Sequence, residues 1–89
     1  MAWTIEYSTH AQKQAKHLDP VIRKRIRQFL DERLATHANP RELGQALKGH
    51  VLGGYWRYKV GAYRIICDIQ DRRFVVLVVE IDHRKQAYR

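Results

Sequence analysis

The sequence has 89 residues, of which 45% are hydrophobic and 29% charged, and its formal net charge at pH 7 is +8. A chain of this length buries one modest core, so we expect a single domain over residues 1–89 and exclude a multidomain enzyme. The hydrophobic content excludes a disordered chain, and the excess of Lys and Arg indicates a polyanionic partner, with nucleic acid favoured over an acidic protein or an anionic membrane.

The N-terminal half predicts one strand followed by two helices. Apolar and polar side chains alternate over residues 2–7, which is the period of a half-buried strand. Ser8 or Thr9 can cap a short, weakly apolar helix after it. Asp19-Pro20 has the pattern of an N-cap followed by proline at the first helical position, and an apolar stripe extends this second helix to about Thr36. We interpret the charged face of the second helix as its solvated side.

The C-terminal half predicts a three-stranded meander. Residues 37–54 contain one proline and four glycines and are expected to be mostly loop. Strand patterns follow over residues 55–60, 62–69 and 73–81, joined by short turns. The apolar run 74–79 is typical of a strand buried on both faces, so we expect this strand to lie centrally, beside the first one. The expected fold is α+β, of order β-α-α-β-β-β, with a two-helix hairpin on one face of an antiparallel sheet.

Strand alternation predicts a basic surface on the meander. Arg57 and Lys59 point to the same side of their strand, away from the apolar residues that face the helices. Arg64 has the same orientation on the next strand and can join them across the hairpin. No acidic residue stands between Glu42 and Asp68 in the sequence, so we expect this cluster to bind phosphate.

The C-terminal segment adds a second basic cluster and an aromatic ring directly after the last strand. This combination suits an unpaired RNA base beside its phosphate, and the alternative interpretation is a solvated chain end. The residues concerned are His83, Arg84, Lys85, Tyr88 and Arg89.

Cleavage of RNA by its own 2′-hydroxyl needs a proton acceptor, stabilisation of charge on the phosphate, and a proton donor for the leaving oxygen. Repulsion between clustered cations lowers the pKa of a lysine, so Lys59 is a candidate base, whereas Arg57 and Arg64 stay charged. Histidine is a common acid or base near neutral pH, but His50 and His83 are each better interpreted as an ordinary loop histidine. The histidines lack paired spacing and the acidic residues do not cluster, so we expect no metal and no other cofactor.

Cys67 is the single cysteine and lies in an apolar run, so we interpret it as a buried hydrophobic residue rather than a nucleophile. No leader pattern opens the sequence, and no apolar stretch reaches the length that spans a bilayer. We therefore expect a cytoplasmic protein without a membrane partner.

A family likeness is carried by YWRYKVGAYRII at residues 55–66, VVLVV at 75–79 and HRKQAYR at 83–89, together with the step Leu47-Lys48-Gly49. In order, spacing and length these segments resemble the RelE/ParE superfamily of bacterial toxin-antitoxin toxins, and most closely its RelE branch. The resemblance implies an endoribonuclease that enters the ribosomal A site, cuts mRNA there without a metal, and leaves a 2′,3′-cyclic phosphate. It also implies a cognate antitoxin that masks the basic surface.

The resemblance further implies roles for single residues. Arg57 and Lys59 match the two basic positions of the family's second strand, and Arg64 matches its phosphate-stabilising arginine. Arg84 matches the general acid, and Tyr88 matches the tyrosine that stacks on the substrate base. The remaining residues expected to bind RNA are Lys48, His83, Lys85 and Arg89.

The sequence leaves open the identity of the general base and two alternative functions. The family's best-known member has lysine where this chain has Arg57, which is a poor base, so proton removal falls to Lys59 or water, with Glu42 and His50 as candidates by loop position. The ParE branch shares the fold but acts on DNA gyrase. The second alternative is a non-catalytic module that binds nucleic acid through the same cations.

Overall fold

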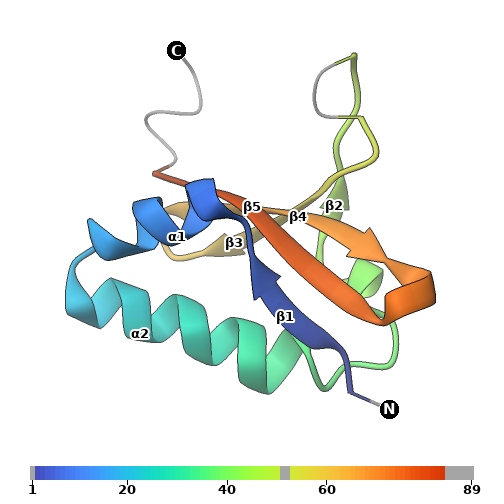
Figure 1. The fold of residues 1–89 in the computed structure, drawn as a ribbon, viewed down its shortest axis with the longest axis horizontal. Helices are drawn as coiled ribbons and strands as arrows, with labels where there is room; N and C mark the ends of the chain where they lie inside the picture. The colour runs from blue at the N-terminus through green and yellow to red at the C-terminus, as the bar shows by residue number, and fades with distance from the viewer. Residues whose placement is uncertain (1, 51–52, 84–89) are drawn as a thin grey trace.

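The computed structural model describes residues 2–50 and 53–83 and shows two helices against a five-stranded sheet (Figure 1). The first half contains β1 (Thr4–Tyr7), α1 (Thr9–Lys16), α2 (Pro20–Gln28) and a π-helical continuation of α2 (Phe29–Leu34). The second half contains a 3-10 turn (Pro40–Leu43), β2 (Gln45–Ala46), β3 (Trp56–Val60), β4 (Tyr63–Gln70), a second 3-10 turn (Asp71–Arg73) and β5 (Val75–His83).

The expected α+β fold is confirmed, with one difference in strand direction. The sheet order is β1-β5-β4-β3-β2, so the first strand lies beside the last and β5 is central, as predicted. The strands from β2 to β5 pair antiparallel, but β1 pairs with β5 in parallel. A parallel pair needs a long crossover connection, and the helices and the meander between β1 and β5 supply it.

Both predicted helix starts are confirmed by their caps. The Ser8 hydroxyl accepts a hydrogen bond from the N–H of Ala11 at 3.0 Å, and the Asp19 carboxylate accepts one from the N–H of Val21 at 2.9 Å. Pro20 occupies the first helical position of α2. The segment predicted to be mostly loop contains one strand that the sequence pattern did not reveal, the two-residue β2.

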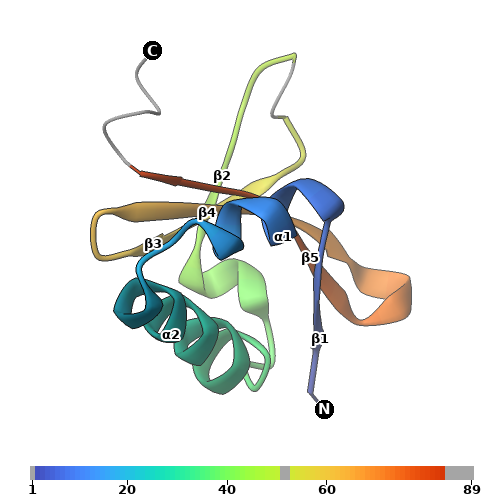
Figure 2. The same ribbon diagram turned by 60° about the vertical axis from the view of Figure 1, so that its left-hand side comes forward.

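The core lies between the helices and one face of the sheet (Figures 1 and 2). Leu30 and Leu34 from the π-helical segment and Ile65 and Val76 from the sheet are all fully buried. Cys67 belongs to the same cluster at 0% exposure, so its interpretation as a buried hydrophobic residue is confirmed. Within the described residues, no helix is long and apolar enough to cross a membrane.

The last strand is less completely buried than its sequence predicted. Val76 and Val78 are fully buried, but Leu77 and Val79 on β5 are only half-buried, and no helix of the described part of the chain covers the side of the sheet on which Leu77 lies. The strand also begins one residue later than the apolar run, since Phe74 has a positive φ of 52° and ends the preceding turn.

Candidate functional site

The three basic residues of the meander gather on the sheet face that points away from the helices. Lys59 on β3 pairs directly with Arg64 on β4, as strand alternation predicted. Arg57 lies two residues before Lys59 on the same side. Tyr58 and Ile65 alternate with these cations and are buried against the helices, at 1% and 0% exposure. The core therefore fixes the backbone that carries the cations.

Arg57 is held at the edge of this cluster by the short strand β2. Its Nη2 donates a hydrogen bond to the side-chain oxygen of Gln45, which is its partner in the β2–β3 register. Among the described residues, its Nε is buried and has no hydrogen-bond acceptor. A buried N–H of a charged group without an acceptor is costly, so the guanidinium is suited to receive an anionic ligand.

A hollow of about 260 Å³ opens beside Arg57 and Lys59. The 3-10 turn before β2 closes its other side, and Glu42 from that turn lines it. The hollow thus brings Glu42, a candidate general base, next to Arg57 and Lys59, which are the residues expected to bind phosphate. His50, the other loop candidate, is exposed in the loop after β2.

Two acidic residues of β5 lie on the same face, and sequence reasoning missed them. The register pairs Asp82 with Arg64 and Glu80 with Ile66, the partner of Arg57. The acid-free stretch between Glu42 and Asp68 in the sequence therefore does not give an acid-free surface. No local pattern signals this arrangement, because it depends on the pairing of β4 with β5.

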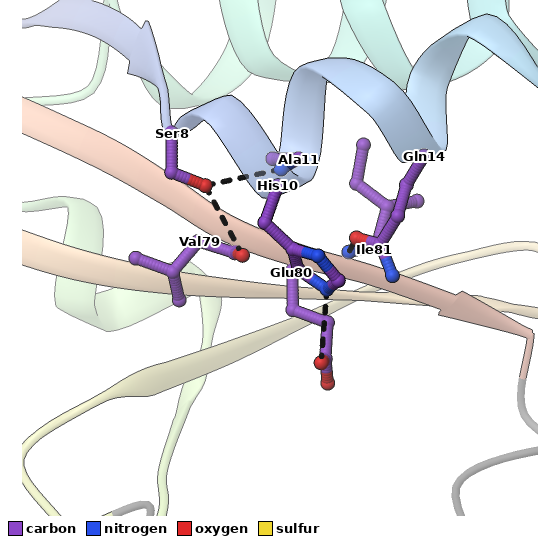
Figure 3. A network of polar contacts seen from close by, with 7 residues as sticks. All are labelled: Ser8, His10, Ala11, Gln14, Val79, Glu80 and Ile81. Carbon is purple, nitrogen blue, oxygen red and sulfur yellow. Dashed lines mark hydrogen bonds and ion pairs between the residues drawn. The ribbon is translucent and has the colours of Figure 1, made fainter.

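Glu80 has an unusual electrostatic environment. A side-chain hydrogen bond with Asp82 raises the pKa of Glu80 above its ordinary value of 4.5, and partial burial and the negative charge of Asp82 act in the same direction. His10 of α1 opposes the shift, with its Nε2 at 3.6 Å from Oε1 of Glu80 (Figure 3). This carboxyl group holds its proton to a higher pH than an ordinary glutamate.

Helix α1 also secures the end of β5, beyond the point where β1 stops. The Ser8 hydroxyl donates a hydrogen bond to the carbonyl of Val79 at 3.3 Å. The side-chain oxygen of Gln14 accepts one from the N–H of Ile81 at 2.6 Å (Figure 3). These contacts fix the position of the strand just before the C-terminal basic segment.

The remaining predicted site residues are not all brought together. His83 pairs with Tyr63, and their rings meet edge-on at 5.1 Å, so His83 lies on the helix side of the sheet and not beside Arg64. Lys48 is exposed in the loop after β2. The predicted residues Arg84, Lys85, Tyr88 and Arg89 lie outside the described residues.

This chain is similar in sequence and in fold to toxins of toxin-antitoxin systems. A family model described as the ParE toxin of the type II toxin-antitoxin system parDE matches residues 5–88. Toxin RelG of Mycobacterium tuberculosis is 28% identical over 89 residues, which cover 100% of this chain and 99% of RelG.

Solved structures agree with this family match. In the RelBE2 toxin-antitoxin complex of M. tuberculosis, the matching chain has a TM-score of 0.84 and 26% identity, covering 94% of this chain and 93% of that one. The RelB-RelE complex of Methanococcus jannaschii gives a TM-score of 0.71 and 27% identity over 93% and 94% of the two chains. Isolated Escherichia coli RelE, at 20% identity and a TM-score of 0.71, covers 92% of this chain and 84% of its own and shares the fold.

Proposed function

Because the chain belongs to the ParE toxin family of type II toxin-antitoxin systems, within the RelE/ParE superfamily, we propose that it is a ribosome-dependent endoribonuclease. In this proposal it cuts mRNA in the ribosomal A site by attack of the RNA's own 2′-hydroxyl, without a metal. The observation that carries the proposal is the cluster of Arg57, Lys59 and Arg64 on one sheet face, beside a hollow that Arg57 and Lys59 line.

The cations are suited to the charge that develops on phosphorus. Guanidinium groups are permanent cations, so Arg57 and Arg64 hold the phosphate oxygens, which become more negative in the transition state. The base that removes the 2′-hydroxyl proton is Lys59, a water molecule or a carboxylate of the same face, and Glu42 lies at the hollow itself. By the family resemblance, Arg84 protonates the leaving oxygen and Tyr88 stacks on the base.

The proposal includes a cognate antitoxin as the normal partner. Several similar solved structures are complexes of a RelE-type toxin with its antitoxin. A net charge of +8 on 89 residues favours a partner that covers the basic face with acidic side chains. Ribosomes and mRNA are the targets after the antitoxin is released, which places the protein in the cytoplasm.

Primer extension on a reporter message in a translating extract tests the nuclease. Wild type is compared with Arg64→Ala and with Arg72→Ala, a matched control in the exposed turn between β4 and β5. Codon-phased cuts are expected with wild type and Arg72→Ala during translation, and none with Arg64→Ala or when translation is blocked. An intact message with wild type contradicts the proposal.

The family model itself favours a second candidate, since it describes ParE toxins and the ParE branch acts on DNA gyrase. This candidate predicts growth arrest with an intact message and inhibition of plasmid supercoiling by purified gyrase. An intact message without growth arrest points to a passive nucleic-acid-binding module.

A further inference from the structure

A second hollow, of about 360 Å³, is lined by residues of α2, of its π-helical continuation and of the β3–β4 hairpin. From the sequence alone, the charged helix residues of this hollow are indistinguishable from the rest of the helix's solvated face. Its lining includes Arg25, Phe29, Glu32, Arg33, Lys59 and Gly61. Three of these residues are cations from different parts of the chain, which the fold brings to one place.

Contacts with neighbouring residues hold the guanidinium groups of Arg25 and Arg33 in position. The guanidinium of Arg25 lies against the hairpin turn, where a Cβ added to Gly61 would be 3.6 Å from its terminal nitrogens. Gly61 has a φ of +58°, a backbone conformation that favours glycine, so the tight turn against which the guanidinium lies is fixed by the backbone. The guanidinium of Arg33 lies over the ring of Phe29 at 5.6 Å, and that ring contacts Tyr58 of the core.

The hollow carries an excess of positive charge. Among residues 2–50 and 53–83, no carboxylate forms an ion pair with Arg25, Arg33 or Lys59. Glu32 is the one acidic side chain among the described lining residues. Guanidinium groups that are held in place without a carboxylate partner are suited to bind an anion, and their paired N–H groups match the oxygens of a phosphate.

Lys59 connects this hollow to the candidate cleavage site, because it lines both hollows. The two hollows therefore meet at Lys59 on β3, and an RNA strand that runs past this strand reaches Arg25 and Arg33 on the helix side of the sheet. The lining is mostly polar, which suits a phosphate better than the apolar face of a protein helix. We propose that the hollow formed by Arg25, Arg33 and Lys59 binds a phosphodiester of RNA next to the one that is cut. The inference rests on the proposed function for the identity of the ligand as RNA, but it does not require cleavage.

The test uses the full chain and a fluorescent eight-nucleotide 2′-O-methyl RNA, which cannot be cut because its 2′-oxygens are blocked. The variant Arg25→Gln/Arg33→Gln removes two charges from the hollow. The matched control Lys24→Gln/Arg27→Gln removes two charges from the same helix outside it. Anisotropy titrations at several salt concentrations give the affinity and its salt dependence, and thermal melts check that both variants fold.

We expect the hollow variant to bind about tenfold more weakly at low salt, with a slope of log K against log salt that is shallower by about 0.7, the share of one phosphate on a single strand. The control should stay close to wild type. Equal losses in both variants, or no loss in either, overturn the proposal. Retained RNA affinity together with weaker binding of an acidic antitoxin peptide assigns the hollow to a protein partner and also overturns it.

Two further comparisons distinguish a folding defect from a loss of RNA binding, and the binding site from the nuclease activity. If the double variant does not fold, Arg25→Gln against Arg27→Gln gives the same comparison with a single exposed residue in each protein. If wild type binds the blocked RNA through this hollow but does not cut mRNA during translation, the proposed nuclease is wrong and the binding site stands.

Discussion

The side-chain oxygen of Gln14 accepts a hydrogen bond from the backbone N–H of Ile81 at 2.6 Å, so a helix side chain takes the place of a neighbouring strand. β1 ends its pairing at Tyr7 opposite Val78, and within residues 2–50 and 53–83 the rest of this edge of β5 has no strand partner. An open strand edge exposes N–H and C=O groups, and α1 satisfies them here with side chains. The segment expected to supply the general acid follows directly after this edge.

Replacing Gln14 by alanine should therefore destabilise the end of β5. The N–H of Ile81 is partly buried and would lose its acceptor, which costs about 1 to 3 kcal/mol of unfolding free energy. Chemical denaturation measures the loss, and faster hydrogen exchange at Ile81 locates it. Gln12→Ala is the control, because Gln12 makes an exposed hydrogen bond to the carbonyl of Tyr7. Equal losses in the two variants would contradict the assigned role.

A second prediction concerns Gly44, which packs against β3 behind the cations. A Cβ at this position would lie 2.7 Å from Cε1 of Tyr58 and 2.9 Å from the carbonyl oxygen of Arg57. The Tyr58 ring has little freedom to move, because its hydroxyl donates a buried hydrogen bond to the carbonyl of Pro40 at 2.9 Å. Gly44→Ala should cost about 1 to 3 kcal/mol through overpacking.

Gly44→Ala should also weaken RNA binding, since the clash pushes the strand that carries Arg57. Thermal melting and anisotropy with the blocked RNA measure the two effects. Gly49→Ala is the control for added side-chain volume, since no atom of the described residues lies within 4 Å of its Cβ position, although its φ of +106° adds backbone strain. Full stability and unchanged RNA affinity in Gly44→Ala would show that Tyr58 and the backbone of Arg57 make room for the added methyl group without loss of free energy.

Local signals in the sequence predicted the elements well. Ser8, Asp19 and Pro20 act through atoms only a few residues away, so their capping roles follow from the sequence alone. Alternation likewise predicted that Lys59 and Arg64 meet, because a tight hairpin fixes which residues pair. These features need no knowledge of the rest of the fold.

Features that depend on distant pairing were not predictable. Asp82 faces Arg64 because of the β4–β5 register, which contains an irregularity between Ile66 and Cys67. An irregularity of this kind changes which of the following residues pair with each other, and no pattern in the sequence predicts it. The meeting of Arg25 with the hairpin turn depends in the same way on how α2 packs on the sheet. The cations of one strand pair were therefore predictable from the sequence, whereas the groups that the tertiary fold adds to them were not.

A third prediction uses the thiol of Cys67 as a reporter of unfolding. Burial raises the pKa of Cys67 far above its usual range, and the charge of Asp68 acts in the same direction. The folded chain should therefore react with iodoacetamide orders of magnitude more slowly than free glutathione in the same buffer, and at a similar rate in strong denaturant. Mass spectrometry follows the labelling. Rapid labelling in native buffer would show that this part of the core opens easily.

The fourth prediction concerns the pH dependence that Glu80 gives to stability. Its pKa is raised in the folded chain, mainly by the hydrogen bond with Asp82, so the folded state binds this proton more tightly than the unfolded state. The contribution of Glu80 to stability is therefore greatest below its ordinary pKa of 4.5 and is lost as the pH rises through the raised value. Glu80→Gln cannot ionise, so it should be more stable than wild type at neutral pH.

The gain from Glu80→Gln should shrink as the pH falls and vanish below about 4.5, where wild type is protonated in both states. Urea denaturation at a series of pH values measures it. Asp82→Asn provides the control, because it removes the neighbouring charge and should return the pKa of Glu80 towards its ordinary value, as carboxyl NMR shifts would show. His10 works against the gain, since its protonated form attracts the ionised Glu80, and His10→Ala should therefore enlarge it. A gain that is constant from pH 4 to pH 8 would mean that Glu80→Gln acts through packing, and that the carboxyl pair on β5 does not hold a shared proton.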